Sequence, residues 1–432
     1  MICDNITTGT NGHLYFAGQD TVELAKQYGT PVYLMDEDKI REKCRIYMEA
    51  FRKFFPEGSQ PLYASKACSF KHLYRIMQDV GMGIDVVSPG EIYTAREAGF
   101  DLSSAYFHGN NKTDDDIAFA MDCGVGYFVA DNLEEIRAIE RCAAERSMTQ
   151  KILLRVTPGI DPHTYDAVST GKVDSKFGNA IETGQAEEVT GEVLSCSHIR
   201  LCGFHCHVGS QVFGEDVFER TADVMVGFMK TIEDRYGFRT EQLNLGGGYG
   251  VRYVEADPEL DIAEKIESVS RAVKGACERY KIPCPAVLME PGRAIVADSG
   301  MTLYTVGNVK RIPEYRNYVS IDGGMTDNPR YALYGSRYTC YIANRMTEPC
   351  RMEATIAGRC CESGDLIQRD VCVPESTCRG DIAAVCTTGA YNYSMASNYN
   401  RIARPPVVML KEGHSSLAVR RETMEDLCRN DI

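Results

Sequence analysis

The sequence contains no run of ~18 uninterrupted apolar residues, the length that a membrane-spanning helix needs. Its residues 1–5 lack the basic segment, followed by an apolar one, that marks a secretory signal. Positive charge is also scarce, because 47 lysines and arginines stand against 61 aspartates and glutamates. The resulting net charge of -14 argues against nucleic acid as a partner. We therefore expect a cytoplasmic protein with neither a membrane nor a nucleic acid as its partner.

Disulfide and metal-binding patterns are missing as well. The 18 cysteines are scattered and several lie inside apolar runs, which favours reduced thiols over a disulfide framework. The densest group lies within residues 202–207 (CGFHCH) and has no second ligand pair at zinc-finger spacing. If this segment is a strand, its two histidines lie on one face and its two cysteines on the other. We therefore predict no metal site.

The sequence does contain a regular alternation of short apolar runs and helical patterns between residues 30 and 298. The runs are continuously apolar, as expected for a parallel sheet covered by helices. Eight strand–helix repeats over roughly 270 residues favour an α/β fold of the (β/α)8 TIM-barrel type, with an open doubly wound sheet as the alternative. The runs are residues 61–64, 83–87, 105–108, 126–130, 152–156, 201–207, 243–245 and 286–289.

Several of the intervening helices have recognisable beginnings. Residues 36–55 place apolar side chains at steps of three and four, and residues 70–80 form another helical pattern. A helix over residues 89–99 begins with Ser88 as its N-cap and a proline in its first position. Thr113, Asn132 and Glu215 open further helices.

After residue 299 the pattern changes to short strands separated by glycine, proline and asparagine turns. The expected strands are residues 301–309, 316–321, 351–357, 370–373 and 382–387, and residues 13–16 form another. With 432 residues the chain is long enough for two or three domains. We predict a barrel domain of residues 30–298 and a β domain of residues 1–29 and 299–432.

Lys66 is the first candidate for chemistry. It follows the apolar run 61–64 and precedes the helix expected over residues 70–80. A lysine at a strand end can form an imine with an aldehyde once it loses its proton, and burial favours that loss. A single lysine is more often a solvated surface charge, so this interpretation depends on the motifs further along the chain.

Two of those motifs suit a phosphate and a pyridine ring. Residues 244–250 (NLGGGYG) follow the seventh expected strand, where barrels commonly bind phosphate through backbone N–H groups. Residues 290–293 (EPGR) end the eighth strand, and a carboxylate there would keep a pyridine nitrogen protonated, which stabilises a carbanion. The alternatives, an ordinary turn and an ion pair between Glu290 and Arg293, stay open at this point.

The β region offers further groups. Residues 358–365 (GRCCESGD) contain a thiol that can donate a proton to a carbanion. The guanidinium of Arg330 suits a carboxylate, and Tyr334 and Tyr391 add phenols. Each of these groups could instead be structural.

In their order along the chain, these motifs resemble the fold-type III pyridoxal-phosphate decarboxylases, the family of ornithine, diaminopimelate and arginine decarboxylases. The resemblance extends from residue 28 to residue 391. It implies an alanine racemase-like barrel with a C-terminal β domain, pyridoxal 5'-phosphate as cofactor, and a homodimer with active sites at the interface. The motifs that carry it are residues 63–67 (YASKA), 205–211 (HCHVGSQ), 244–248 (NLGGG), 290–293 (EPGR) and 361–365 (CESGD).

The resemblance also implies catalytic roles. Lys66 would hold the cofactor as an imine, His207 would stack on its ring, and Glu290 would pair with its pyridine nitrogen. Cys361 of the partner subunit would donate the proton. The implied cofactor ligands besides these are Ser210, Gly247, Gly248, Gly292, Arg293 and Tyr391, and the implied substrate ligands are Arg293, Arg330, Tyr334, Glu362 and Tyr391.

With a glutamate directly after the cysteine of residues 361–365, the sequence resembles the diaminopimelate branch of this family. This implies decarboxylation of meso-2,6-diaminopimelate to L-lysine and CO2, the last step of lysine biosynthesis, through an external aldimine and a quinonoid carbanion. Glu362 would bind the distal amine of the substrate and Arg330 its distal carboxylate. The alternatives are a decarboxylase of ornithine, arginine or carboxynorspermidine, a racemase, and a pyridoxal-binding protein without activity. The loop of residues 159–171 departs from the family pattern, so no substrate contact is assigned to it.

Overall fold

The computed structural model describes residues 1–160 and 174–432. The chain divides into two compact units. We call residues 43–250 and 260–292 the barrel unit, and residues 1–42, 251–259 and 293–432 the β unit. Most of the loop that departs from the family pattern, residues 161–171, lies outside the described residues.

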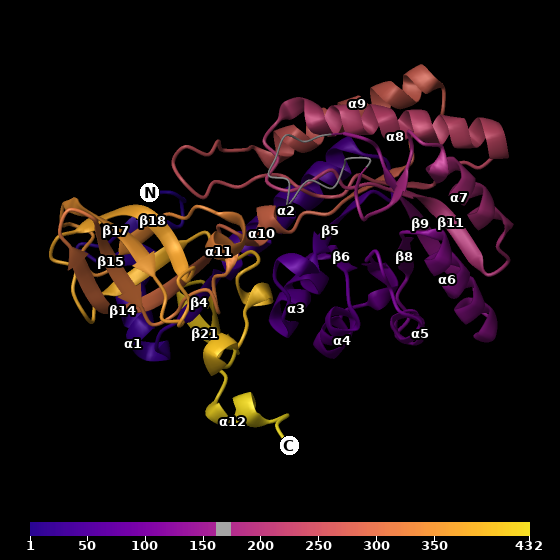
Figure 1. The fold of residues 1–432 in the computed structure, drawn as a ribbon. Helices are drawn as coiled ribbons and strands as arrows, with labels where there is room; N and C mark the ends of the chain where they lie inside the picture. The colour runs from indigo at the N-terminus through magenta and orange to yellow at the C-terminus, as the bar shows by residue number, and fades with distance from the viewer. Residues whose placement is uncertain (161–173) are drawn as a thin grey trace. The chain divides into compact units, whose positions relative to one another are not determined.

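The barrel unit contains a closed ring of parallel strands (Figure 1). The first strand pairs with the last, and the fourth pairs with the fifth, so the sheet has no free edge. Its residues are almost all buried, which explains the continuously apolar runs. The TIM barrel is thereby confirmed over the open sheet. The strands are β5 (Gln60–Ala64), β6 (Gly83–Val86), β7 (Ala105–Phe107), β8 (Tyr127–Ala130), β9 (Gln150–Thr157), β11 (Ile199–His205), β12 (Gln242–Asn244) and β13 (Ala286–Met289), and the short β10 (Asn179–Ala180) extends β9.

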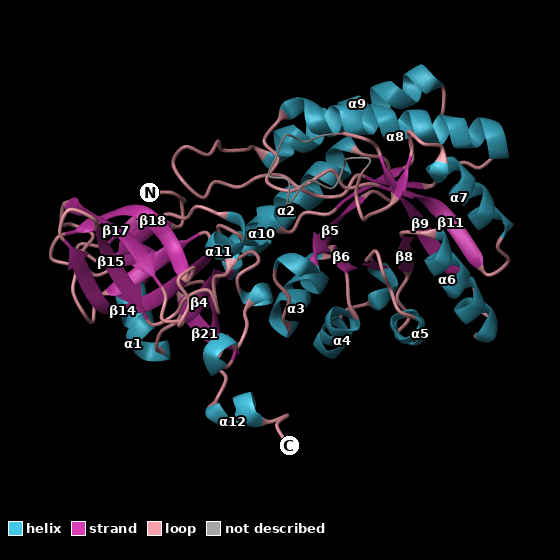
Figure 2. Ribbon diagram, in the orientation of Figure 1, coloured by secondary structure: helices cyan, strands magenta, loops and turns pink. Residues whose placement is uncertain are grey.

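Helices surround these strands, as Figure 2 shows. The predicted helix beginnings are confirmed where a cap is described: the side chains of Ser88, Thr113 and Asn132 each accept a backbone N–H from the first turn. The helices are α3 (Lys71–Val80), α4 (Pro89–Ala98), α5 (Asp114–Asp122), α6 (Leu133–Glu145), α7 (Gln185–Ser195), α8 (Glu215–Tyr236) and α9 (Ile262–Tyr280), while α2 (Glu37–Phe54) spans the division between the units.

The β unit is built on one large sheet. Its buried core includes Leu34, Leu303 and Val408 from three neighbouring strands. In spatial order the strands are β18 (Leu366–Pro374), β17 (Cys350–Ala357), β15 (Arg316–Ile321), β14 (Gly300–Ile312), β4 (Val32–Asp36), β20 (Val407–Lys411) and β21 (His414–Val419). In addition, β19 (Ile382–Cys386) pairs with β14, and β16 (Cys340–Ile342) pairs with β19. A small sheet holds β1 (Ile6–Thr8), β2 (Leu14–Phe16) and β3 (Gln19–Asp20), and the helices are α1 (Thr21–Tyr28), α10 (Arg293–Val296), α11 (Arg330–Tyr334) and α12 (Met424–Cys428).

Strand β4 lies in a different unit from the predicted one, because the predicted barrel domain begins at residue 30. Met35 pairs with Gly300 of β14 and with Met409 of β20, so this strand belongs to the sheet of the β unit. All five of its residues are buried. An apolar strand buried on both faces has the same pattern in either sheet, so the sequence alone does not assign it.

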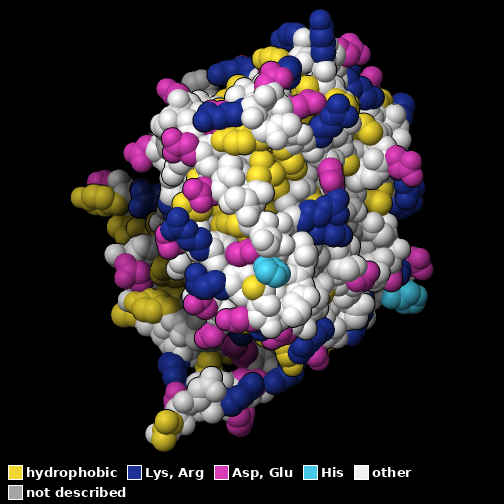
Figure 3. Space-filling model, turned by 90° about the vertical axis from the view of Figure 1, so that its right-hand side faces the viewer, with side chains coloured by type: hydrophobic (Ala, Val, Ile, Leu, Met, Phe, Trp, Pro, Cys, Tyr) yellow, Lys and Arg dark blue, Asp and Glu magenta, His cyan; other side chains and the backbone are white. Residues whose placement is uncertain are grey.

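The surface agrees with the acidic composition. On the face shown in Figure 3, lysine and arginine side chains alternate with aspartate and glutamate side chains, and the described residues there form no continuous basic surface. Among the described residues, no helix is long and apolar enough to cross a membrane.

Candidate active site

Lys66 lies at the carboxyl end of β5, in a short turn of residues Ser65–Ala67. Its two neighbours are buried, whereas Lys66 itself is exposed, in contrast to the burial that the sequence argument assumed. The positive charge of Lys66 acts on Asp85 at the end of β6 and on His207 beyond β11. The lysine therefore lies at the barrel end where the other strands also finish.

His207 is half-buried and bound to the glycine loop. Its Nδ1 accepts the backbone N–H of Gly247 at 3.2 Å. Burial, followed by the charge of Lys66 and that of Arg155, holds the pKa of His207 well below its usual value. The ring is therefore neutral near pH 7, and a flat neutral imidazole fits the expected stacking on a pyridine ring.

Glu290 is buried just after β13 and has three polar neighbours. Its carboxylate lies 2.8 Å from His108 Nε2 and 3.3 Å from His205 Nε2, and it accepts the Asn244 side-chain N–H at 2.7 Å. Burial alone would raise the pKa of Glu290, but the two imidazoles outweigh it and hold this pKa well below its usual range. Glu290 is therefore an ionised carboxylate, the form needed beside a protonated pyridine nitrogen.

His108 and Asn244 also belong to this site, although neither was predicted from the sequence as a site residue. Both are buried polar residues at the carboxyl ends of barrel strands, and the apolar run 105–108 ends on His108. Buried polar residues at this barrel end were the available signal. The ligand atoms of His108, His205 and Glu290 lie within 4.8 Å of one another, a spacing that a metal ion could also use. The amide donor of Asn244 on the same carboxylate favours the hydrogen-bonded arrangement over a metal.

The glycine loop requires residues without side chains. A Cβ at Gly247 would lie 2.0 Å from the carbonyl oxygen of Glu290, and a Cβ at Gly248 would lie 2.2 Å from that of Gly209. The loop that carries Ser210 joins it, because Val212 donates its N–H to the Gly248 carbonyl at 2.9 Å. The predicted phosphate ligands of the barrel unit are thus brought together.

Gly292 packs against the strand that leads to Lys66. A Cβ there would lie 2.9 Å from the Cβ of Ala64, and the Ala64 N–H donates to the carbonyl of Pro291 at 3.1 Å. The glutamate end and the lysine end of the barrel site are therefore adjacent. The exposed backbone of the glycine segments fits the phosphate of pyridoxal phosphate, and the neutral imidazole of His207 beside them fits its ring.

In the β unit, Arg293 and Arg330 share one partner that the sequence analysis did not select. Both guanidinium groups donate to the hydroxyl of Tyr253, at 2.8 and 3.0 Å. Burial would raise the pKa of this phenol, but the two positive charges outweigh burial and lower it. Both guanidinium groups also lie over the ring of Tyr391, at 4.7 and 5.4 Å. Three predicted ligands, Arg293, Arg330 and Tyr391, therefore lie together in this unit. The fourth, Tyr334, is exposed at the end of α11.

Cys361 and Glu362 are exposed on a loop whose shape depends on Asp365. The buried carboxylate of Asp365 accepts the backbone N–H groups of Cys360 and Met325, each at 2.6 Å. Cys361 in turn donates its N–H to the side-chain oxygen of Asn400 at 2.8 Å. The thiol and the carboxylate are therefore presented outward on a firmly bound loop.

Comparisons with known proteins agree with this geometry. A family described as "Pyridoxal-dependent decarboxylase, pyridoxal binding domain" matches residues 37–297. The diaminopimelate decarboxylase of Bacillus subtilis (strain 168) is 44% identical over 422 residues, which cover 98% of this chain and 96% of the relative. The chain belongs to the family of pyridoxal-dependent diaminopimelate decarboxylases. The predicted family, enzyme class and cofactor are thereby confirmed.

Other members of the family give the same picture. The diaminopimelate decarboxylase of Staphylococcus aureus (strain COL) is 43% identical, with 98% of each chain covered. The crystal structure of diaminopimelate decarboxylase from M. jannaschii in co-complex with L-lysine has a TM-score of 0.91 at 31% identity, covering 100% of this chain and 98% of that one. The enzyme from Helicobacter pylori complexed with L-lysine has a TM-score of 0.85 at 28% identity, covering 95% of this chain and 98% of that one.

Proposed function

We propose that the chain decarboxylates meso-2,6-diaminopimelate to L-lysine and CO2, as the last step of lysine biosynthesis. The observation that carries the proposal is Glu290, an ionised carboxylate held by His108, His205 and Asn244 at the barrel end where Lys66 lies. The full-length similarity to diaminopimelate decarboxylases supports the choice of substrate.

Residues of the barrel unit, together with Arg293 and Tyr391 of the β unit, hold the cofactor. Pyridoxal phosphate, when bound, supplies an electron sink for the pair of electrons left by the departing CO2. Lys66 holds its aldehyde carbon, and Glu290 keeps its ring nitrogen protonated. The phosphate ligands are Ser210, Gly247, Gly248, Gly292, Arg293 and Tyr391.

The residues of the β unit hold the substrate. Arg330 binds its distal carboxylate and Glu362 its distal amine, a pair of contacts that ornithine and arginine do not match. Arg293, Tyr334 and Tyr391 complete the substrate ligands. The thiol of Cys361 then delivers a proton to the carbon that has lost CO2.

We also propose a homodimer in which Cys361 of the partner subunit serves each site. The exposure of Cys361 and Glu362 in a single chain supports this arrangement. A cytoplasmic location stays a prediction, supported by 18 cysteines of which none forms a disulfide in the structure.

A substrate panel tests the proposed activity. The holoenzyme should release CO2 from meso-2,6-diaminopimelate and form L-lysine, with little release from ornithine, arginine or carboxynorspermidine. Glu362→Ala should relax discrimination against substrates that lack the distal amine, because the contact to that amine is lost. Equal release from ornithine, or inversion of the substrate without CO2, would reject the proposal in favour of a related decarboxylase or a racemase.

A further inference from the structure

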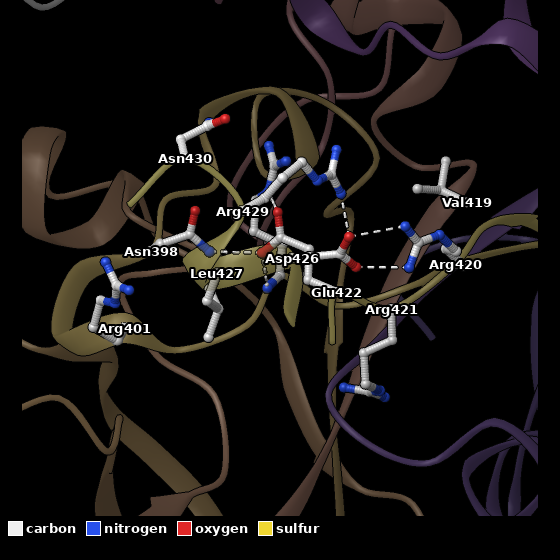
Figure 4. Close-up of a pocket in the computed structure, with 11 residues that line it drawn as sticks. Asn398, Arg401, Val419, Arg420, Arg421, Glu422, Asp426, Leu427, Arg429 and Asn430 are labelled. Carbon is white, nitrogen blue, oxygen red and sulfur yellow. Dashed lines mark hydrogen bonds and ion pairs between the residues drawn. The ribbon is translucent and has the colours of Figure 1, made fainter. Parts of the chain in front are cut away.

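A cavity in the β unit is lined by residues to which no role was assigned above. It encloses about 540 Å³ and is lined by the segments 398–404 and 419–430 (Figure 4). This volume is in the range of small-molecule sites. Its lining contains five arginines, Arg401, Arg404, Arg420, Arg421 and Arg429, against two carboxylates, those of Glu422 and Asp426.

Four of these arginines pair with a carboxylate: Arg401 with Asp431, Arg404 with Glu422, and both Arg420 and Arg429 with Asp426. Asp426 alone serves both Arg420 and Arg429, and Figure 4 shows its carboxylate between the two guanidinium groups. Arg421 donates to the backbone carbonyls of Tyr28 and Pro31, at 3.4 and 2.8 Å. A guanidinium has five N–H donors, and each of these contacts uses one or two. The cavity therefore concentrates positive charge and free donors on a chain whose net charge is -14.

We propose that this cavity binds a small oxyanion with two or more negative charges, such as a phosphorylated or dicarboxylic metabolite. Bidentate guanidinium groups match the oxygens of both classes. None of the residues that line it is among the proposed phosphate ligands of the cofactor.

The cavity is connected to the loop of Cys361, so this part of the proposal rests on the proposed function. Asn400, whose side chain accepts the Cys361 N–H, lies between lining residues Asn398 and Arg401. Asn400 and Arg401 have φ values of 51° and 57°, a region that costs free energy for residues other than glycine. Asn398 stabilises this turn by donating to the Ile402 carbonyl at 3.0 Å and to Glu422 at 2.6 Å. An anion on Arg401 would further order the turn that holds the catalytic thiol.

Calorimetric titration of the pyridoxal phosphate-loaded enzyme tests the binding. Pyrophosphate and succinate are the two probes, and they distinguish a phosphate ligand from a dicarboxylate. At least one should bind saturably, once per chain, with the cofactor absorbance unchanged. Arg429→Gln and Arg401→Gln should each weaken binding about tenfold or more, the scale of one lost charge-assisted contact. Arg137→Gln is the matched control, because Arg137 is similarly exposed and also pairs with a carboxylate three residues away.

The alkylation rate of Cys361 by iodoacetamide tests the connection. Saturation with the bound probe should change this rate at least threefold, measured by peptide mass spectrometry, while the exposed Cys350 stays unchanged as a reference. Absence of saturable binding of either probe, or equal affinities of R429Q and R137Q, would overturn the site. An unchanged Cys361 rate would overturn the connection. If binding persists in a protein that releases no CO2 from diaminopimelate, the proposed function fails and the anion site stands.

Discussion

At the scale of single residues, Glu290 shows how a buried charge is kept ionised. A carboxylate without partners would take up a proton when buried. Here two imidazoles and one amide surround it, so burial strengthens its effect on a neighbouring cation instead of neutralising it. The charge of this side chain, more than its shape, should therefore determine the rate.

Replacing Glu290 with glutamine tests this role. Glu290→Gln should lower kcat by a factor on the order of 10²–10³, the scale of losing one key electrostatic group. Glu135→Gln is the control, because Glu135 is also a buried glutamate and pairs with Lys112 at 2.8 Å outside the proposed site. Steady-state CO2 release by both variants measures the difference, and similar rates in the two would remove Glu290 from the mechanism.

Asp85 predicts a pH dependence of stability. Burial raises its pKa to about 6 in the folded chain, against ~3.9 for an exposed aspartate. Because the folded pKa is the higher one, its stabilising contribution is complete below the unfolded pKa and is lost as pH rises through about 6. Asp85→Asn cannot ionise. Its free energy of unfolding, relative to that of the wild type, should therefore rise by up to about 3 kcal/mol from about pH 4 to about pH 8. Urea unfolding at both pH values measures this, and a pH-independent difference would contradict it.

Motif residues could be selected from the sequence, whereas their partners could not. Lys66, His207 and Glu290 stand in recognisable patterns at strand ends. Tyr253 carries no such pattern, because a lone tyrosine acquires a role only through the groups that folding brings beside it. Asn244 stands in the NLGGG motif, but its contact with Glu290 follows only from the folded barrel. The exposure of Lys66 was also not predictable, since it depends on the packing around a three-residue turn.

At the scale of elements, the loop after β12 is constrained by close backbone contacts. Gly247 faces the carbonyl of Glu290 and Gly248 faces that of Gly209, so the loop is fixed by the segments after β13 and β11. Movement of this loop would therefore disturb the phosphate ligands and the segment of Glu290 together.

Gly247→Ala should release the cofactor. Its Cβ would clash with a backbone oxygen at 2.0 Å, so the loop must shift, and affinity for pyridoxal phosphate should fall about tenfold or more. Gly275→Ala in α9 is the control, because nothing lies within 4 Å of its Cβ and alanine is the better helix former. The cofactor retained after dialysis, read from its absorbance, compares the two variants. Equal retention would show that the loop tolerates a side chain.

Most elements could be predicted from the sequence, but not every partner of each strand. The eight barrel strands follow from continuously apolar runs, and the helices follow from the 3.6-residue period and their caps. Strand β4 does not, because its pairing with β14 and β20 joins segments far apart in the chain. Strands β20 and β21 were not predicted at all, since the analysis identified no strand beyond residue 387.

At the scale of the whole molecule, the proposed dimer has a direct test. Lys66→Ala and Cys361→Ala should each be inactive as pure proteins, because one lacks the amine and the other the proton donor. If every site takes Lys66 from one subunit and Cys361 from its partner, mixing the two variants and letting subunits exchange should restore about a quarter of the wild-type activity, from random pairing. Absence of recovery despite exchange, followed by mass spectrometry of the mixed dimers, would place both residues in the same chain.

The pairing of β4 has a consequence for synthesis of the protein. This strand leaves the ribosome early, yet its neighbours on both sides, β14 and β20, are made after the last barrel strand. The barrel segments are available to fold first, while the five residues of β4, four of them apolar, have no hydrogen-bonding neighbours yet. A nascent chain that stalls before residue 411 therefore exposes an unpaired strand that is prone to aggregate. A chaperone that binds such a product is expected to bind Val32–Asp36.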